Sequence, residues 1–426
     1  MVVLLCLLAA VMLALGFEML LVMGVPAVLS RFIYQPMMPD MVVAQKMVAG
    51  VNVSTLLAIP FFIFAADIMA RGTIAARLMN LIKRNLGHVS GGIGHTTVAS
   101  CMTFGAVCGS APATVAALGR LLNPELVRAG YSQKFSLGLI AASAECALLI
   151  PPSITLIIYG WLTGASIAAL FAGGLAVGIV LGIGFMIQVQ LETWRRGVGR
   201  APRASRAERL DALKAGILAL GMPVVILGGI YTGYFTATEA AAVGVAYALL
   251  VEMGIYRSLT WRQVIEVAES SAVTVVVVFV LLAMGSLISY FITLARLPDV
   301  LTALLQAYDV NWVVFLLIVN VIFLVAGMFI DPNSILLVFV PTLYPVATAL
   351  GIDPIHFGLV VCLNICIGMI TPPFGMDLFV TSSTLNKPVE SVIAGIWPFI
   401  ATNIAVLMVI SYVPSISTAL PRLFGH

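Results

Sequence analysis

Long apolar runs, separated by short clusters of polar and charged residues, follow one another from end to end of the sequence. Several reach the roughly 20 residues that a helix needs to cross a bilayer. The clearest are Met1 to Leu29, Ile167 to Leu191, Ala268 to Ile292 and Val389 to Tyr412. The first run has no basic start and no small-residue cleavage site, so we interpret it as a retained helix. This pattern predicts an all-α polytopic membrane protein.

Two stretches interrupt the pattern with a small polar tip between two short apolar arms. The first tip is Gly109-Ser110, and the arm from Ala111 to Leu122 is too short to cross a bilayer. The second tip is Asp331-Pro332-Asn333, within the segment Trp312 to Leu350. Two short arms that meet at a polar tip are typical of a re-entrant hairpin, which leaves the membrane on the side from which it entered.

Two other spans, Ser132 to Leu162 and Ile355 to Leu385, each contain a double proline. Proline lacks an amide donor and clashes with the preceding turn, so each span should consist of two half-helices around an unwound middle. Such backbone is tolerated at membrane depth only where it is buried in protein or lines a cavity. Pro151-Pro152 and Pro372-Pro373 therefore predict two broken helices.

The hairpins and broken helices form two copies of one unit. Four proline and glycine positions recur at a constant offset of 221 residues: Pro124/Pro345, Gly130/Gly351, Pro151/Pro372 and Pro152/Pro373. These residues restrict or free the backbone at defined points, so the agreement indicates a structural repeat. The same offset places Ser110 opposite Asp331.

Composition and charge indicate that the repeat lies in a membrane and which of its loops face the cytoplasm. With 62% hydrophobic and only 9% charged residues, the chain is too apolar for a soluble domain, and a net charge of +3 gives no support for nucleic-acid binding. The polar connector Glu192 to Ala215, which includes Arg200, is rich in arginine and is therefore predicted to be cytoplasmic. Threading outward from it leaves four of the 21 basic residues outside: Arg31, Lys46, Arg296 and Arg422.

Five predicted crossings separate the two hairpins, and because this number is odd the two copies should be inserted in opposite senses. An inverted repeat with hairpins and broken helices is the layout of many secondary transporters. We divide the chain into residues 1–86 (scaffold helices and a surface arm), 87–165 (first hairpin and broken helix), 166–293 (scaffold, with connector 192–215), 294–388 (outer arm, second hairpin and broken helix) and 389–426 (C-terminal helix). The units 87–165 and 294–388 are the predicted transport domain.

Candidate chemistry lies at the tips and breaks. Ser110 and Asp331 are favoured N-cap residues, and they could do no more than cap. The stronger interpretation is that the helix N-termini, with free amides and partial positive charge, face an anionic substrate. Unwound carbonyls at the prolines, with the hydroxyls of Ser153 and Thr371, are hard oxygen ligands of the kind that sodium prefers. The candidate substrate-binding residues are Ser110, Ala111, Pro152, Asp331, Asn333 and Pro373.

Six motifs spread over nearly the whole chain carry a resemblance to a known family. They are Gly87-His88 with Gly91-Gly92 and His95, Gly109-Ser110-Ala111, Ile150-Pro151-Pro152-Ser153-Ile154, Thr236-Ala237-Thr238-Glu239-Ala240-Ala241-Ala242, Gly327-Met328-Phe329-Ile330-Asp331-Pro332 and Thr371-Pro372-Pro373-Phe374-Gly375. With them the chain resembles the large membrane subunit of tripartite ATP-independent periplasmic (TRAP) transporters.

The resemblance implies an elevator-type sodium symporter in the bacterial inner membrane, in contact with lipid. It also implies an organic anion as substrate, usually a carboxylate, a periplasmic solute-binding protein that delivers it, and a small four-helix membrane subunit as partner. Sodium ions would be the coupling ions. Carried over by motif, one sodium site would involve Ser110, Pro151 and Ser153, and the other Gly327, Asp331, Gly368 and Thr371.

Three positions depart from the family pattern. The first tip ends at Thr114, where the family has an aspartate. Glu145 stands where a small polar residue is more common, and Asp377 lies in a normally apolar stretch. Either acid could replace the missing charge, or it could pair with a buried donor.

Two other functions are consistent with parts of the sequence. A stand-alone anion symporter or exchanger would share the fold without needing a binding protein. A membrane-embedded enzyme is the weaker hypothesis, because the chain has no His-Glu-x-x-His zinc signature and no aspartate-rich cluster. The histidines at 88, 95 and 356 are not spaced as metal ligands, so we expect loop or interface roles for them and no enzymatic activity.

Overall fold

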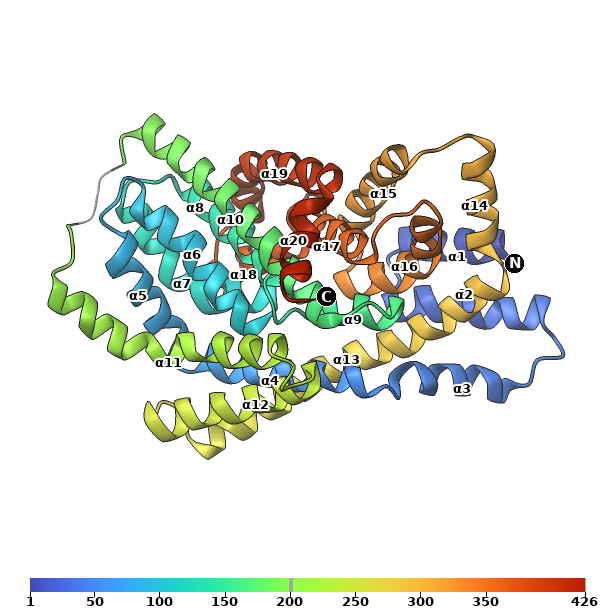
Figure 1. Ribbon diagram of the computed structural model, residues 1–426, viewed down its shortest axis with the longest axis horizontal. Coiled ribbons are helices and arrows are strands. Elements are labelled where there is room, and N and C mark those ends of the chain that lie inside the picture. The colour runs from blue at the N-terminus through green and yellow to red at the C-terminus, as the bar shows by residue number, and fades with distance from the viewer. Residues whose placement is uncertain (199–201, 426) are drawn as a thin grey trace.

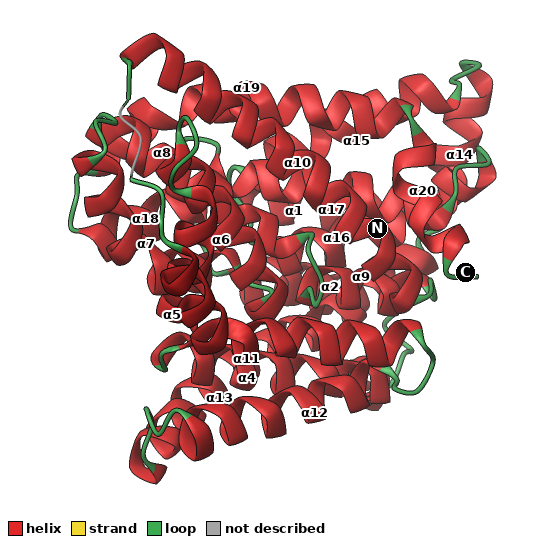
Figure 2. Cartoon of the chain, turned by 60° about the vertical axis from the view of Figure 1, so that its left-hand side comes forward, coloured by secondary structure: helices red, strands yellow, loops and turns green. Residues whose placement is uncertain are grey.

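The computed structural model describes residues 1–198 and 202–425. Arg200 of the predicted connector lies outside the described residues, as does residue 426. Within the described ranges every regular element is a helix, as Figure 2 shows. In residues 1–198 and 202–425, seven helical segments are long and apolar enough to cross a membrane: Ser54–Arg71, Ile167–Arg196, Arg206–Tyr231, Ala237–Ile255, Trp261–Leu294, Pro332–Ala349 and Val389–Tyr412. The prediction of an all-α polytopic chain is confirmed.

The N-terminal region differs from the sequence prediction. The apolar run Met1 to Leu29 is two helices, α1 (Val2–Ala14) and α2 (Met19–Tyr34), rather than one. Gly16 adopts a left-handed φ of 77°, which ends the first helix before Glu18 starts the second. The polar stretch after α2 is also partly helical, because α3 spans Asp40–Val51, and the next long helix, α4, starts at Ala58.

The remaining helices of the first half follow the predicted breaks. Their bounds are α4 (Ala58–Arg71), α5 (Ile74–Leu86), α6 (Gly92–Cys108), α7 (Ala111–Arg128), α8 (Gln133–Glu145), α9 (Ile154–Thr163) and α10 (Ile167–Arg196). The first hairpin is α6 and α7, and the first broken helix is α8 and α9. The amphipathic helix α5 packs its apolar face on α6 and α11.

The second half repeats these features. Its helices are α11 (Arg206–Tyr231), α12 (Ala237–Leu249), α13 (Trp261–Leu294), α14 (Leu297–Ala307), α15 (Trp312–Gly327), α16 (Pro332–Ala349), α17 (Pro354–Ile370), α18 (Met376–Leu385), α19 (Val389–Tyr412) and α20 (Pro414–Leu423). The second hairpin is α15 and α16, and the second broken helix is α17 and α18. The predicted connector is shorter than expected, because α10 and α11 extend into it. Thr236 and Glu239 form a capping box at the start of α12.

The helices fall into two groups that lie on different sides of the molecule. In Figure 1, α3, α4, α11, α12 and α13 lie along the lower edge, and the hairpins and broken helices lie above them. Helix α4 packs on both α12 and α13, while α13 also packs on α2 and α3. Helix α10, which the sequence analysis grouped with the scaffold, packs on α6, α17, α19 and α20.

Candidate functional site

The first hairpin tip rests on the first broken helix. Gly109 ends α6 with a left-handed φ of 60°, and a Cβ at this position would overlap the carbonyl oxygen of Pro152. Only glycine permits both the backbone angle and the close approach. Gly109 thus seats the tip that carries Ser110 against the buried Pro151-Pro152 segment, which directly precedes Ser153 at the N-cap of α9.

Ser110 caps α7, and Thr114 ties the same turn together. The Ser110 hydroxyl accepts a hydrogen bond from the Ala113 amide at 3.4 Å. The Thr114 hydroxyl donates to the Ser110 carbonyl oxygen at 2.9 Å and is buried. Thr114 therefore supplies a neutral donor at the position where the sequence comparison led us to look for an acid.

Ser153 joins the two halves of the first broken helix. Its hydroxyl donates to the Leu148 carbonyl oxygen at 2.5 Å and accepts from the Leu156 amide at 3.3 Å. The side chain thus caps α9 and holds the unwound segment in place. One oxygen lone pair of the hydroxyl stays available for a further ligand.

The second tip is capped by a carboxylate. Asp331 Oδ2 accepts from the backbone amides of Asn333 and Ser334, both at 3.2 Å, and Pro332 occupies the first helical position. Oδ1 of Asp331 has no hydrogen bond within the described residues, and the side chain is half-buried. The tip therefore presents a free carboxylate oxygen together with the N-terminus of α16.

The second hairpin also rests on its broken helix, through two glycines. A Cβ on Gly327 would stand 2.8 Å from the Cα of Gly368, so the two backbones are in contact. The rings of Phe329 and Phe374 lie 5.8 Å apart, centroid to centroid, and connect the tip to the break. The Thr371 hydroxyl donates to the Ile367 carbonyl oxygen at 2.6 Å. Gly327, Gly368 and Thr371 thus lie on touching elements.

The two breaks differ in exposure. Pro151 and Pro152 are buried, whereas Pro373 and the following Phe374 are exposed. Both double prolines contain a cis peptide bond. The two copies therefore share their local backbone but not their surroundings.

The two units pack across one another. The second arm of the first hairpin, α7, contacts α18, and the second arm of the second hairpin, α16, contacts α9. Arg120 Nε donates to the Thr384 carbonyl oxygen at 3.1 Å, and the rings of Tyr159 and Tyr344 meet edge to face at 6.4 Å. Each hairpin is therefore packed on both broken helices, on its own at the tip and on that of the other copy along the arm.

A family model for the tripartite ATP-independent periplasmic transporter, DctM component, matches residues 5–416. The chain belongs to this family. The matched residues include both hairpins and both broken helices. The match identifies the molecule as the large permease component of a TRAP transporter.

The names of the relatives of this TRAP permease mention different solutes. The ectoine TRAP transporter large permease protein TeaC of Halomonas elongata is 41% identical over 393 residues, which cover 91% of each chain. The C4-dicarboxylate TRAP transporter large permease protein DctM of Rhodobacter capsulatus is 36% identical over 416 residues, 93% of this chain and 94% of the relative. The sialic acid TRAP transporter large permease protein SiaM of Vibrio cholerae is 37% identical over 381 residues, 89% of each. All are transporter subunits, so the expectation of a transporter rather than an enzyme is confirmed.

A solved structure shares the fold at low sequence identity. The crystal structure of the Alcanivorax borkumensis YdaH transporter matches with a TM-score of 0.56 at 16% identity, covering 90% of the permease and 87% of that chain. The fold is therefore that of a membrane transporter.

The permease contains a buried polar network that the sequence analysis did not find. The Asn364 amide donates to Asn320 Oδ1 at 2.8 Å, and the Asn320 amide donates to the Ser411 hydroxyl at 3.0 Å. His356 lies 3.2 Å from both the Ser417 hydroxyl and the Ser411 carbonyl oxygen, which makes it an interface histidine. The network joins α15, α17, α19 and α20, which lie apart in the sequence, so no local pattern could signal it.

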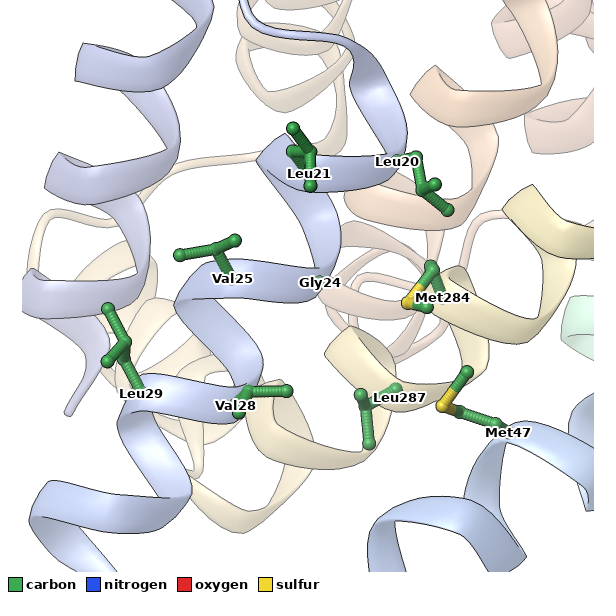
Figure 3. Close-up of a pocket in the computed structure, with 9 residues that line it drawn as sticks. All are labelled: Leu20, Leu21, Gly24, Val25, Val28, Leu29, Met47, Met284 and Leu287. Carbon is green, nitrogen blue, oxygen red and sulfur yellow. The ribbon is translucent and has the colours of Figure 1, made fainter.

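A cavity of about 350 Å³ lies between α2, α3 and α13 (Figure 3). Its lining is entirely apolar: Leu20, Leu21, Gly24, Val25, Val28, Leu29, Met47, Met284 and Leu287. Such a lining has no group that could hold a sodium ion or a carboxylate. The cavity is therefore not the candidate site.

Proposed function

We propose that this permease takes up a small solute bearing a carboxylate, coupled to sodium ions. The observation that carries the proposal is the double contact of tip and break, Gly109 on Pro152 and Gly327 on Gly368. Each contact puts a helix N-terminus beside unwound backbone. Helix N-termini bind anions, and unwound carbonyls with hydroxyls bind hard cations.

The residues present fit a sodium ion in chemical type. All available donors are oxygens: backbone carbonyls at the breaks, the hydroxyls of Ser110, Ser153 and Thr371, and the free Oδ1 of Asp331. In the proposal, Ser110, Pro151 and Ser153 belong to one sodium site, and Gly327, Asp331, Gly368 and Thr371 to the other. Bound sodium would supply positive charge next to the two helix N-termini, where the substrate carboxylate would lie.

The substrate would contact the two tips and the two double prolines. The residues proposed to bind it are Ser110, Ala111, Pro152, Asp331, Asn333 and Pro373. Ectoine, C4-dicarboxylates and sialic acid all carry a carboxylate, which is the feature that a pair of helix N-termini recognises. We propose that this shared group, rather than the rest of the solute, is what the permease itself binds.

The movement proposed is of the elevator type. The moving body would consist of the two hairpins, the two broken helices and α10 and α19, which pack around them. Helices α2 to α4 and α11 to α13 would form the static scaffold. The proposal includes a small membrane subunit beside the scaffold and a periplasmic binding protein that delivers the solute.

Uptake into proteoliposomes tests the proposal. The permease and its small subunit are reconstituted, and uptake of labelled ectoine, succinate and sialic acid is measured with the matching binding protein outside. Uptake of one solute under an inward sodium gradient, absent when choline replaces sodium, is the expected result. Equal uptake in sodium and choline would refute the coupling, and equal uptake without binding protein would favour the stand-alone symporter.

A further inference from the structure

Three helices of the hairpin body, which consists of the two hairpins, the two broken helices, α10 and α19, carry two buried acids and a buried amide. Glu145 is the last residue of α8, and its Oε1 accepts a hydrogen bond from the Asn403 amide of α19 at 2.6 Å. Asp377 lies in the first turn of α18, which packs on both α8 and α19. All three side chains are 0% exposed. The cluster is therefore a fully buried meeting point of three segments distant in the sequence.

Asp377 has no hydrogen-bond partner for either carboxylate oxygen within the described residues. Its helix, α18, contacts the helices that carry Glu145 and Asn403. Thr381 is one helical turn after Asp377, on the same face of α18, and its buried hydroxyl also has no hydrogen-bond partner among the described residues. Buried polar groups are hydrogen-bonded in the large majority of cases, so this concentration of unpaired atoms requires an explanation.

Five buried oxygens of the cluster have no hydrogen-bond partner in the part of the chain that the structure describes: Glu145 Oε2, both carboxylate oxygens of Asp377, Thr381 Oγ1 and Asn403 Oδ1. Every one of them can accept an interaction, and the one amide of Asn403 already donates to Glu145. Among the described residues, no lysine, arginine or histidine forms an ion pair with either acid. Two buried carboxylates without a counter-charge are very unfavourable.

We propose that Glu145, Asp377, Thr381 and Asn403 form a binding site for one sodium-like monovalent cation in the interior of the hairpin body. A hard cation binds carboxylate, hydroxyl and amide oxygens such as these and neutralises part of their charge. Calcium fits less well, because it takes six to eight oxygen ligands. Zinc fits less well too, because the acids lack the histidine or thiolate partners that it prefers.

The site is distinct from the two proposed at the hairpin tips. Glu145 precedes Pro151 by six residues, and Asp377 follows Thr371 by six. The cation would connect the inner end of α8 with α18 and α19, and so join the first broken helix to the second. Its role in this arrangement is to hold the hairpin body together as one unit, whichever way the transport sites face.

Sodium binding by the full-length chain, purified in detergent, tests the inference without a transport assay. The number of bound ²²Na⁺ ions per chain is measured for the wild type and for Glu145→Gln, Asp377→Asn and Thr381→Val. Ser110→Ala and Asp331→Ser report on the tip sites. Glu390→Gln, an exposed acid on α19, is the matched control. We expect Asp377→Asn to lose about one ion per chain that the tip variants and the control retain.

Thermal unfolding in sodium and in choline at equal ionic strength gives a second readout. Sodium should raise the Tm of the wild type by mass action. Asp377→Asn should respond less to sodium and should be at least as stable as the wild type in choline, because the substitution removes a buried charge.

Three results would overturn the inference. The first is an unchanged ion count in both Glu145→Gln and Asp377→Asn. The second is a rise in the wild-type Tm on acidification in choline that equals the rise given by sodium, which would mean that protons alone neutralise the cluster. The third is a Tm that responds to calcium but not to sodium. Failure of sodium-coupled uptake alone would refute the function proposed above and leave this site untouched.

Discussion

Gly327 and Gly368 touch backbone to backbone, so that the second hairpin is seated on the helix before the second break. The first copy has the same relationship. There a Cβ on Gly105 would stand 2.7 Å from the Cα of Ala147, and Ala147 is 221 residues before Gly368. Close contact between hairpin and broken helix is thus a property of the repeat and not of one copy.

Gly327→Ala should push the second hairpin off α17. The added methyl group has no free space, because its nearest neighbour is backbone, and such overpacking costs about 1–3 kcal/mol. We expect a lower Tm and reduced uptake. Thermal unfolding of the purified permease and uptake into proteoliposomes measure the two effects.

Gly228→Ala is the control for that variant. Gly228 lies in α11, where a Cβ would meet no atom within 4 Å. Because glycine within a helix is less favourable than alanine by roughly 0.5–1 kcal/mol, this variant should be as stable as the wild type or more stable. Equal Tm values for the two alanine variants would contradict the contact.

Asp331→Ser separates capping from binding. Serine keeps an oxygen for the helix N-terminus, so stability should change by less than about 1 kcal/mol. The negative charge is lost, however, and the sodium concentration for half-maximal uptake should rise about tenfold or more. Uptake measured as a function of sodium concentration is the test.

Asp353→Ser is the matched comparison. Asp353 caps α17 with the same geometry, accepting from the amides of Ile355 and His356 at 2.8 and 3.1 Å, and it also precedes a proline. It lies at the far end of α17 from the break. Its substitution should leave the sodium dependence unchanged, and an equal shift in both variants would assign Asp331 to capping alone.

Thr114→Val should loosen the first tip. The variant keeps the shape of the side chain but removes the donor to the Ser110 carbonyl oxygen, which is worth about 0.5–1.5 kcal/mol. Besides the loss of stability, the sodium concentration needed for half-maximal uptake should rise, because Ser110 is then less well positioned. Thr103→Val on α6 is the control. Its hydroxyl makes a similar bond, to the Ala99 carbonyl oxygen at 2.7 Å, but away from the tip. Identical sodium dependence in both variants would argue against a role for the tip.

Glu252→Gln should destabilise the scaffold without altering sodium affinity. Glu252 is 0% exposed, and its Oε1 accepts from the amides of Thr73 and Ile74, both at 2.9 Å, at the start of α5. The substitution exchanges a charged acceptor for a neutral one and adds donors at a site filled with donors, so a loss of about 2–3 kcal/mol is expected. Glu266→Gln, which removes exposed ion pairs with Arg71 and Arg262, should cost less than about 1 kcal/mol. Chemical or thermal unfolding distinguishes the two.

Local sequence rules were sufficient for the interruptions of the helices. Gly109, Asp331 and the two double prolines act on the backbone through their own chemistry, and the structure has helix ends at each of them. The same rules failed where a weaker signal lay inside an apolar run. Gly16 ends α1 although nothing polar precedes it. Hydrophobicity alone therefore predicted one helix where the structure has two.

The sequence by itself determined the class of the protein, the duplication and the places where helices stop, because composition, prolines, glycines and capping residues act within a few residues of themselves. Only the tertiary structure decided which interrupted segments touch and which buried groups meet. Glu145 and Asn403 are 258 residues apart and share one hydrogen bond. A contact of that kind depends on how whole helices pack, and no short stretch of chain contains that information.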